Sequence, residues 1–418
     1  MALDFELLPP KEEVPDTPPS ALVWTIVFFV LVILGVLGVL MLWPKDESTS
    51  TLWFWTCVTV FPTGLASFVV LSHFSAYEGR RNGAIEWNKA CDNYIETELA
   101  RESRPMVVLA SAFRFSSNEK EDTLDQVLGE SLTLPTHPTP AKDPATVTAR
   151  WFQKPATDAR GNPLHDDVSR HERVLTWLFG ELLAKTVDAV KTLPRGVRLS
   201  VHLAVTGTKD ADVIVRLWNA TWTQHKLFPL RPTVTSTESG LMLLDEWLNR
   251  AAQTQAHEAR LMVAVNLSPL LGAAPADGSA EAGSAVLLMP EAVQRANGLP
   301  CQAVVCRPNR VCAAEGREVA LARAAQWATV RTSDTTHLWL AGLEAHTAGQ
   351  AGAPLVTVGA EAGKTDLDHR VGHAGEASPW LALTAACMAV AAEPAVHVIA
   401  SGSGAAHTYA VVRGPQPE

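Results

Sequence analysis

The chain has 418 residues, 47% of them apolar, and a formal net charge of −10. The negative charge argues against nucleic acid as a partner, because such proteins neutralise phosphates with basic side chains. Six cysteines are scattered along the chain: Cys57, Cys91, Cys301, Cys306, Cys312 and Cys387. Cys301, Cys306 and Cys312 lack the paired two-residue spacing of a zinc site, so we expect free thiols, no metal and no cofactor.

Two charge-free apolar runs lie near the N-terminus, Leu22 to Trp43 and Leu52 to Phe74. At about 1.5 Å per helical residue, each run matches a hydrocarbon core of about 30 Å. A short polar loop separates them, so residues 21–74 are predicted to form a transmembrane helical hairpin in contact with the lipid bilayer. A secretory signal followed by a core helix is the weaker alternative, because no basic segment precedes the first run.

The segments on either side of this hairpin indicate its orientation. Residues 1–20 contain five prolines and mostly acidic charge, which is typical of a disordered tail. Residues 75–104 have helical spacing and are expected to form a juxtamembrane helix. Arg80, Arg81 and Lys89 follow the second run, so the positive-inside rule places the N-terminus and the soluble domain in the cytoplasm.

Strands and helices alternate beyond residue 104. A buried strand is expected at 105–111, a polar, proline-rich surface excursion at 115–165, and a helix at 169–191 with a capping box of Ser169 and Glu172. The further strands are expected at 196–206, 261–267, 285–289, 337–341, 354–359, 395–401 and 407–413, and the further helices at 211–224, 241–256, 315–328 and 379–392. This alternation predicts a layered α/β fold in which helices cover mixed sheets.

Four segments in the last third resemble motifs of the β-ketoacyl synthase branch of the thiolase-like superfamily, and they occur in that family's order. The segments are Glu281 to Leu288 (similar to G-E-G-A-G-A-L-V-L), Glu344 to Gly349 (E-A-H-G-T-G), Val371 to Ala377 (I-G-H-x-E-A-A-G) and Gly402 to His407 (G-F-G-G-T-N). The resemblance implies a thiolase-like layered α/β domain after the two transmembrane helices. Its N-terminal half is expected at 105–256 and its C-terminal half at 257–418.

The family's chemistry uses a cysteine nucleophile at a buried helix N-terminus, together with two histidines. The histidines correspond to His346 and His373, which are the candidate catalytic residues; alternatively, both are structural histidines inherited with the fold. We expect the nucleophile in the turn 206–210, which contains no cysteine; Thr208 would be a poor substitute, because no adjacent base is evident. Covalent acyl transfer is therefore not expected, and a ligand pocket is predicted from Thr208, His346, His373, Gly402 and Gly404.

Two functions remain open at this stage. The segment from Tyr77 to Asn88 resembles inner-membrane accessory proteins associated with bacterial type VI secretion. That resemblance implies a multi-pass protein of the bacterial inner membrane, acting as a non-catalytic adaptor with a secreted effector or the secretion apparatus as its partner. The alternative is a membrane-associated acyl-thioester enzyme, of decarboxylase or condensing type, that uses His346 and His373. Thiolase-like domains usually pair through a central strand, so a homodimer is also possible, unless the excursion at 131–165 blocks or replaces that interface.

Overall fold

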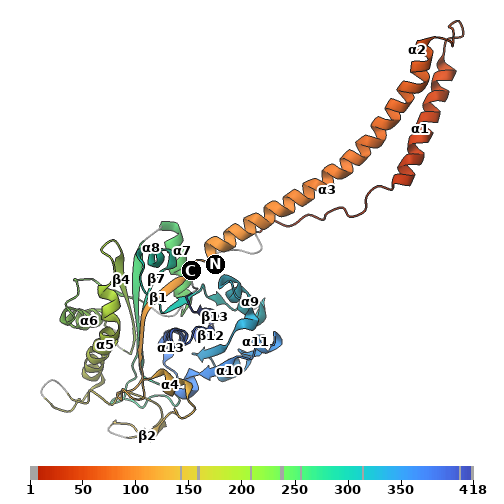
Figure 1. The fold of residues 1–418 in the computed structure, drawn as a ribbon. Coiled ribbons are helices and arrows are strands. Elements are labelled where there is room, and N and C mark those ends of the chain that lie inside the picture. The colour runs from red at the N-terminus through yellow and green to blue at the C-terminus, as the bar shows by residue number, and fades with distance from the viewer. Residues whose placement is uncertain are drawn as a thin grey trace. The chain divides into compact units, whose positions relative to one another are not determined.

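The computed structural model describes residues 8–141, 144–157, 161–207, 210–235, 240–254, 257–312, 315–403 and 406–415 (Figure 1). Two residues of the predicted ligand pocket, Thr208 and Gly404, lie outside these residues. The chain divides into two compact units, one that ends at Glu98 and one that runs from Leu99 to Glu418. Each unit is described by itself.

The first unit contains two long helical stretches. They comprise α1 (Ala21–Leu42) and the continuous run of α2 (Leu52–Trp55), a π-helical turn η2 (Thr56–Val60) and α3 (Phe61–Glu102). Both stretches are long and apolar enough to cross a membrane, judged by length and composition alone. The side chain of Ser20 caps α1 and that of Thr51 caps α2. These hydroxyls satisfy backbone N–H groups that have no partner inside the helix.

The two helical stretches pack closely at a small residue. A Cβ atom added to Gly35 would lie 2.7 Å from Cβ of Pro62. Trp24 also stacks on His73, with 4.0 Å between ring centroids. In lipid no hydrophobic force drives helices together, so they associate through close packing, which glycine permits. The sequence therefore builds a packed hairpin, and its location in a membrane remains a prediction.

The second unit is built on one mixed sheet with the strand order β11-β10-β12-β13-β8-β1-β7-β6-β4-β5, and β9 pairs with β13. Its strands are β1 (Met106–Arg114), β4 (Arg198–Thr206), β5 (Thr233–Val234), β6 (Glu258–Asn266), β7 (Ala282–Pro290), β8 (Ala303–Val305), β9 (Asn309–Arg310), β10 (His337–Ala341), β11 (Gly363–Asp366), β12 (Val396–Ser403) and β13 (Ala406–Arg413). A separate pair consists of β2 (Thr136–Pro138) and β3 (Thr146–Thr148).

This sheet consists of two halves with the same pairing pattern. In the first half β1–β7 and β7–β6 are antiparallel, whereas β6–β4 and β4–β5 are parallel. In the second half β8–β13 and β13–β12 are antiparallel, whereas β12–β10 and β10–β11 are parallel. An antiparallel pairing of β1 with β8 joins the halves. The first half therefore continues to β7, beyond the boundary predicted at 256/257, because β6 and β7 pair with strands of that half.

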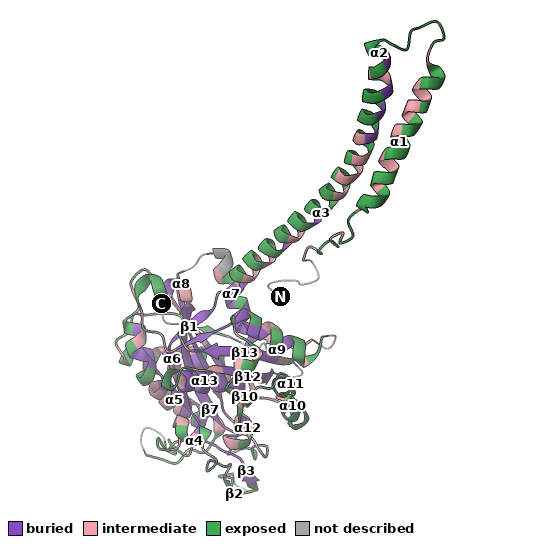
Figure 2. Ribbon diagram, turned by 45° about the vertical axis from the view of Figure 1, so that its right-hand side comes forward, coloured by how far each residue is buried: buried purple, intermediate pink, exposed green. Residues whose placement is uncertain are grey.

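Helices cover both faces of the sheet. They are α4 (Leu124–Leu128), α5 (Asp167–Lys191), α6 (Ala211–Gln224), α7 (Met242–Thr254), α8 (Glu291–Asn297), α9 (Gly316–Trp327), α10 (Ala345–Gln350), α11 (Ala353–Thr357), α12 (Leu367–Arg370) and α13 (Ser378–Ala392). One buried cluster contains apolar side chains of α7 and α13, and Trp247 and Trp380 meet there at 6.0 Å between rings. The other cluster contains side chains of α5, α6, α9, α10 and α11. The central strands β1, β6 and β7 and the helix α13 are largely buried (Figure 2).

The predicted layered α/β fold is confirmed, with local corrections. The strand expected at 354–359 is wrong: Pro354 lies in the first turn of helix α11, where its missing N–H costs nothing. The cap of α5 is Asp166 rather than Ser169, since Asp166 Oδ1 accepts a hydrogen bond from Ser169 N at 2.8 Å. Asp and Ser are comparable caps, so sequence alone could not choose between them.

Candidate functional site

The two candidate histidines are both exposed. His346 lies in the first turn of α10, and its Nε2 accepts a hydrogen bond from Gln350 Nε2 at 3.1 Å. His373 follows α12, and 53% of its side chain is exposed. Among the described residues, no hydrogen bond or ring contact joins the two imidazoles. The structure therefore shows them as separate surface groups rather than as a shared buried pair.

Asp368 organises the surroundings of His373. Its Oδ2 lies 3.4 Å from Nδ1 of His373 and accepts a hydrogen bond from Gly342 N at 2.7 Å. The hydrogen bond with Asp368 raises the pKa of His373, against the opposing effect of partial burial. The second oxygen, Oδ1, is buried without a hydrogen-bond partner among the described residues. Asp368 thus connects the His373 turn to the end of β10.

Gly402 has a packing role at the same end of the sheet. Gly342 has φ = +68°, and a Cβ atom there would lie 2.6 Å from the carbonyl oxygen of Gly402. Only glycine tolerates this backbone conformation and this close approach together. The glycine loop that resembles G-F-G-G-T-N therefore lets β12 pass close to the turn after β10.

The backbone of His373 is fixed by neighbours from two other segments. His373 N donates to Gly278 O at 2.8 Å, and Ala280 N donates to His373 O at 2.9 Å. On the other side of this segment, Arg150 N donates to Ser279 O at 3.0 Å. The excursion at 115–165 is thereby joined to the histidine turn through residues 278–280.

A buried ion pair fastens this excursion to the core. The carboxylate of Glu281 is fully buried and accepts hydrogen bonds from Arg170 Nη1 at 2.8 Å and Nη2 at 2.6 Å. It also accepts from Phe152 N at 2.9 Å and Ser268 N at 3.0 Å. Four donors satisfy a carboxylate that would otherwise be costly to bury. Glu281 thus has a structural role within the segment that resembles G-E-G-A-G.

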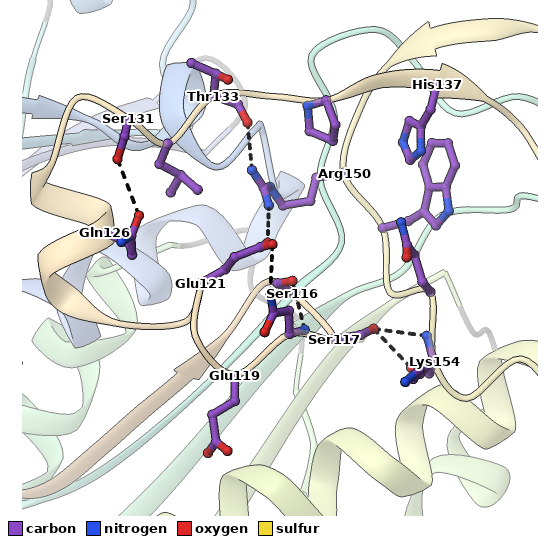
Figure 3. Close-up of a pocket in the computed structure, with 15 residues that line it drawn as sticks. Ser116, Ser117, Glu119, Glu121, Gln126, Ser131, Thr133, His137, Arg150 and Lys154 are labelled. Carbon is purple, nitrogen blue, oxygen red and sulfur yellow. Dashed lines mark hydrogen bonds and ion pairs between the residues drawn. The ribbon is translucent and has the colours of Figure 1, made fainter.

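The excursion lines an open polar pocket of about 720 Å³, which the sequence did not indicate (Figure 3). The guanidinium of Arg150 lies in its wall, donating to Thr133 O at 2.8 Å and to Glu121 Oε2 at 3.2 Å. His137 stacks on Trp151 with 3.8 Å between rings. The lining residues are Ser116, Ser117, Asn118, Glu119, Glu121, Gln126, Ser131, Leu132, Thr133, Pro135, His137, Arg150, Trp151, Gln153 and Lys154.

The repeated topology shows which connection of the first half is equivalent to the turn that carries His373. His373 lies between β11 and α13, and the equivalent connection in the first half lies between β5 and α7, at residues 235–241. Helix α7 contributes to the buried cluster of α13, whereas α6 packs on α5 and begins at an exposed residue. The turn 206–210 is therefore not the equivalent position. We missed this because β5 has only two residues and no apolar run to reveal it.

Neither connection carries a cysteine. The sequence of 206–210 is Thr-Gly-Thr-Lys-Asp and that of 235–241 is Thr-Ser-Thr-Glu-Ser-Gly-Leu, although residues 208–209 and 236–239 lie outside the described part. Burial raises the pKa of Cys306 to about 11 and that of Cys387 further still. Thiols held in the protonated form are poor nucleophiles.

Solved structures with a similar fold are ketosynthases. A ketosynthase from module 6 of the bacillaene synthase of Bacillus subtilis aligns with a TM-score of 0.55 and 10% identity, over 75% of this chain and 71% of that one. The module 1 ketosynthase of the bacillaene synthase of Bacillus amyloliquefaciens aligns with a TM-score of 0.50 and 11% identity, over 76% and 77%. The ishigamide ketosynthase/chain length factor gives a TM-score of 0.50 and 16% identity, over 75% and 100%.

Comparisons based on sequence give no match. No protein-family model matches this chain, and no curated protein matches it. At 10–16% identity the structural likeness is informative about the fold alone. The part of the chain after the apolar helices has the layered α/β fold of ketosynthase domains, that is, the thiolase-like fold.

Proposed function

We propose that this chain is a membrane-anchored, non-catalytic ketosynthase-like protein. The apolar hairpin holds it in a bacterial inner membrane, with the N-terminus and the ketosynthase-like unit in the cytoplasm. It acts as an accessory or adaptor protein that binds an effector of a type VI secretion system, or the secretion apparatus itself.

The observation that carries the proposal is the missing nucleophile. No cysteine occurs in the sequence between Cys91 and Cys301, which includes both candidate turns. The thiolase-like reaction needs a thiolate to form the acyl-enzyme bond, and neither serine nor threonine replaces it without an adjacent base. The exposure of His346 and His373 also favours a binding role, since oxyanion stabilisation depends on exclusion of water.

The adaptor role rests on the anchor and on the segment from Tyr77 to Asn88. An affinity-tagged full chain, extracted from native membranes in mild detergent, is expected to co-purify with one secreted effector. Deletion of the gene is expected to abolish secretion of that effector and to leave secretion of other effectors unchanged. Normal secretion of every effector in the deletion strain would refute the adaptor role.

The pairing of His373 with Asp368 favours the alternative function, an acyl-thioester enzyme. A carboxylate that raises the pKa of a histidine can orient it for proton transfer. The full chain is therefore incubated with malonyl- and acyl-thioesters, and thiol release is measured for the wild type, His346→Ala and His373→Ala. The proposal predicts no turnover in any of them. Turnover that His346→Ala or His373→Ala abolishes would establish the enzyme instead.

A further inference from the structure

The N-terminal strap, residues 9–16, lies along α3 within the first unit. Trp87 Nε1 donates to Pro10 O at 3.1 Å, and Tyr77 Oη donates to Pro15 O at 3.0 Å. Asn88 Nδ2 donates to Glu12 O at 2.9 Å, and Asn88 Oδ1 accepts from Glu12 N at 2.8 Å. Composition alone predicted a disordered tail, because these donors lie more than 60 residues away in sequence.

The lengths of the strap and of the helix match. Tyr77 and Trp87 are ten residues apart, which is about 15 Å along a helix. Pro10 and Pro15 are five residues apart, which is about 15.5 Å in a polyproline II conformation. The strap therefore runs antiparallel to α3, fully extended between its two outer hydrogen bonds.

The strap has the backbone that polyproline II recognition requires. Residues 8–20 form neither helix nor strand. Pro9, Pro10 and Pro15 fix φ near −65°, and each also holds the preceding residue in an extended conformation. An extended chain of this kind has carbonyl groups without internal partners, so indole N–H, phenol O–H and amide N–H groups of another surface can bind them.

The contacting side chains form a defined face of α3. Tyr77, Ala84 and Cys91 recur every seven residues, and Ala84 and Cys91 are only 4% and 3% exposed. The Sγ atom of Cys91 lies 4.0 Å from Pro10 O. Trp87 and Asn88 flank this line and supply donors. We call this set the α3 face.

The α3 face binds the backbone more than the side chains of the strap. Among the described residues, one ion pair joins strap and helix side chains, Lys11 Nζ to Asp92 Oδ1 at 2.7 Å, and both partners are more than half exposed. Exposed ion pairs contribute little to binding. The surface is therefore suited to any extended proline-rich segment, with a modest preference for a basic residue after the prolines.

We propose that the α3 face is the recognition surface for a proline-rich, extended segment of the protein partner, and that the chain's own strap occupies it until the partner segment replaces it. This inference rests on the proposed adaptor function and names the kind of partner segment. None of residues 9–16 is fully buried, which is typical of segments that open locally at small cost.

The probe is a labelled synthetic peptide with the sequence of residues 8–19, Leu-Pro-Pro-Lys-Glu-Glu-Val-Pro-Asp-Thr-Pro-Pro. Fluorescence anisotropy measures its binding to the full chain in detergent micelles. The comparison is between the wild type and a full-length variant with Pro9→Gly, Pro10→Gly and Pro15→Gly, which loosens the strap. A tethered competitor acts at about millimolar effective concentration, so a peptide with a Kd of about 100 µM should bind the loosened variant about tenfold more tightly.

Two controls make the result specific. Adding Trp87→Ala and Asn88→Ala to the loosened variant should abolish binding, and a peptide with glycine in place of every proline should not bind. Both substituted side chains are on the helix surface, and circular dichroism checks that helix content is unchanged. Equal affinity for the wild type and the loosened variant would overturn the proposal, as would binding that survives Trp87→Ala with Asn88→Ala.

These experiments also distinguish a partner segment from other occupants of the α3 face. They separate failure of this inference from failure of the adaptor proposal. Peptide-sensitive dimers of the wild type, seen by light scattering, would show that a second copy's strap is the occupant, and would refute a partner segment. Failure of peptide binding while a secreted effector still co-purifies would leave the adaptor function standing and remove the α3 face from it. Peptide binding together with normal effector secretion in the deletion strain would refute the adaptor function alone.

Discussion

Substituting Glu281→Gln is expected to destabilise the ketosynthase-like unit strongly. The substitution keeps the size and shape of the side chain but removes the negative charge that faces Arg170. Both groups are buried, with Arg170 6% exposed and Glu281 not exposed at all. Removing one partner of a buried ion pair typically costs about 3–5 kcal/mol, because the remaining charge is left without compensation. We expect a loss of about 3 kcal/mol, since the glutamine oxygen can still accept one or two of the four hydrogen bonds.

The free energy of unfolding is measured by urea titration of the full chain, followed by circular dichroism. A second readout is limited proteolysis within 115–165. Phe152 joins that excursion to the ion pair, because its N–H donates to Glu281 and its carbonyl oxygen accepts from Arg170 Nη2. Arg170→Met is the matched partner variant. In the double variant no buried charge remains unpaired, so its loss should be smaller than the sum of the two single losses by about 2 kcal/mol. A loss below about 1 kcal/mol for Glu281→Gln, or fully additive losses, would refute the reasoning.

Three further predictions concern pH dependence and packing. Burial lowers the pKa of His397 to about 4, below the value of about 6.5 expected for an unfolded chain. The stabilisation from the neutral imidazole is therefore complete above pH 6.5, and up to about 3 kcal/mol of unfolding free energy is lost as the pH falls towards 4. His397→Gln should flatten this slope in urea titrations at several pH values. Gly342→Ala should cost about 1–3 kcal/mol of unfolding free energy because its Cβ meets Gly402 O, whereas Gly349→Ala, with nothing within 4 Å, should be nearly neutral in the same titration. Gly35→Leu should separate the two helical stretches of the hairpin and increase its protease sensitivity in detergent, and unchanged sensitivity would contradict the close packing described for this position.

Strongly patterned elements could be predicted from the sequence. Helix α6 and strand β10 have the predicted bounds, because apolar periodicity and local caps determine them. The ketosynthase-like fold could be predicted from four short glycine and histidine motifs that occur in the family's order. Helix α11 could not, since Leu355 and Val356 read equally well as part of a buried strand.

Features set by distant residues escaped prediction. Strands β5 and β11 are short and carry no apolar run, so they exist only through pairing with β4 and β10. Because β5 was not predicted, the sequence pointed to 206–210 for the nucleophile turn, whereas the connection equivalent to the His373 turn is 235–241. The position of the His373 turn also depends on distant groups, since its backbone is held by Gly278 and Ala280. The strap on α3 depends in the same way on Trp87 and Asn88.

Intact-protein mass spectrometry after incubation with malonyl- and acyl-thioesters tests the central claim most directly. The claim is that this ketosynthase-like protein binds a partner and does not form an acyl-enzyme bond. We predict an unchanged mass for the full chain, even after long incubation with excess thioester. A stoichiometric acyl adduct, mapped to residues 206–210 or 235–241 and lost on substitution of the modified side chain, would contradict the claim.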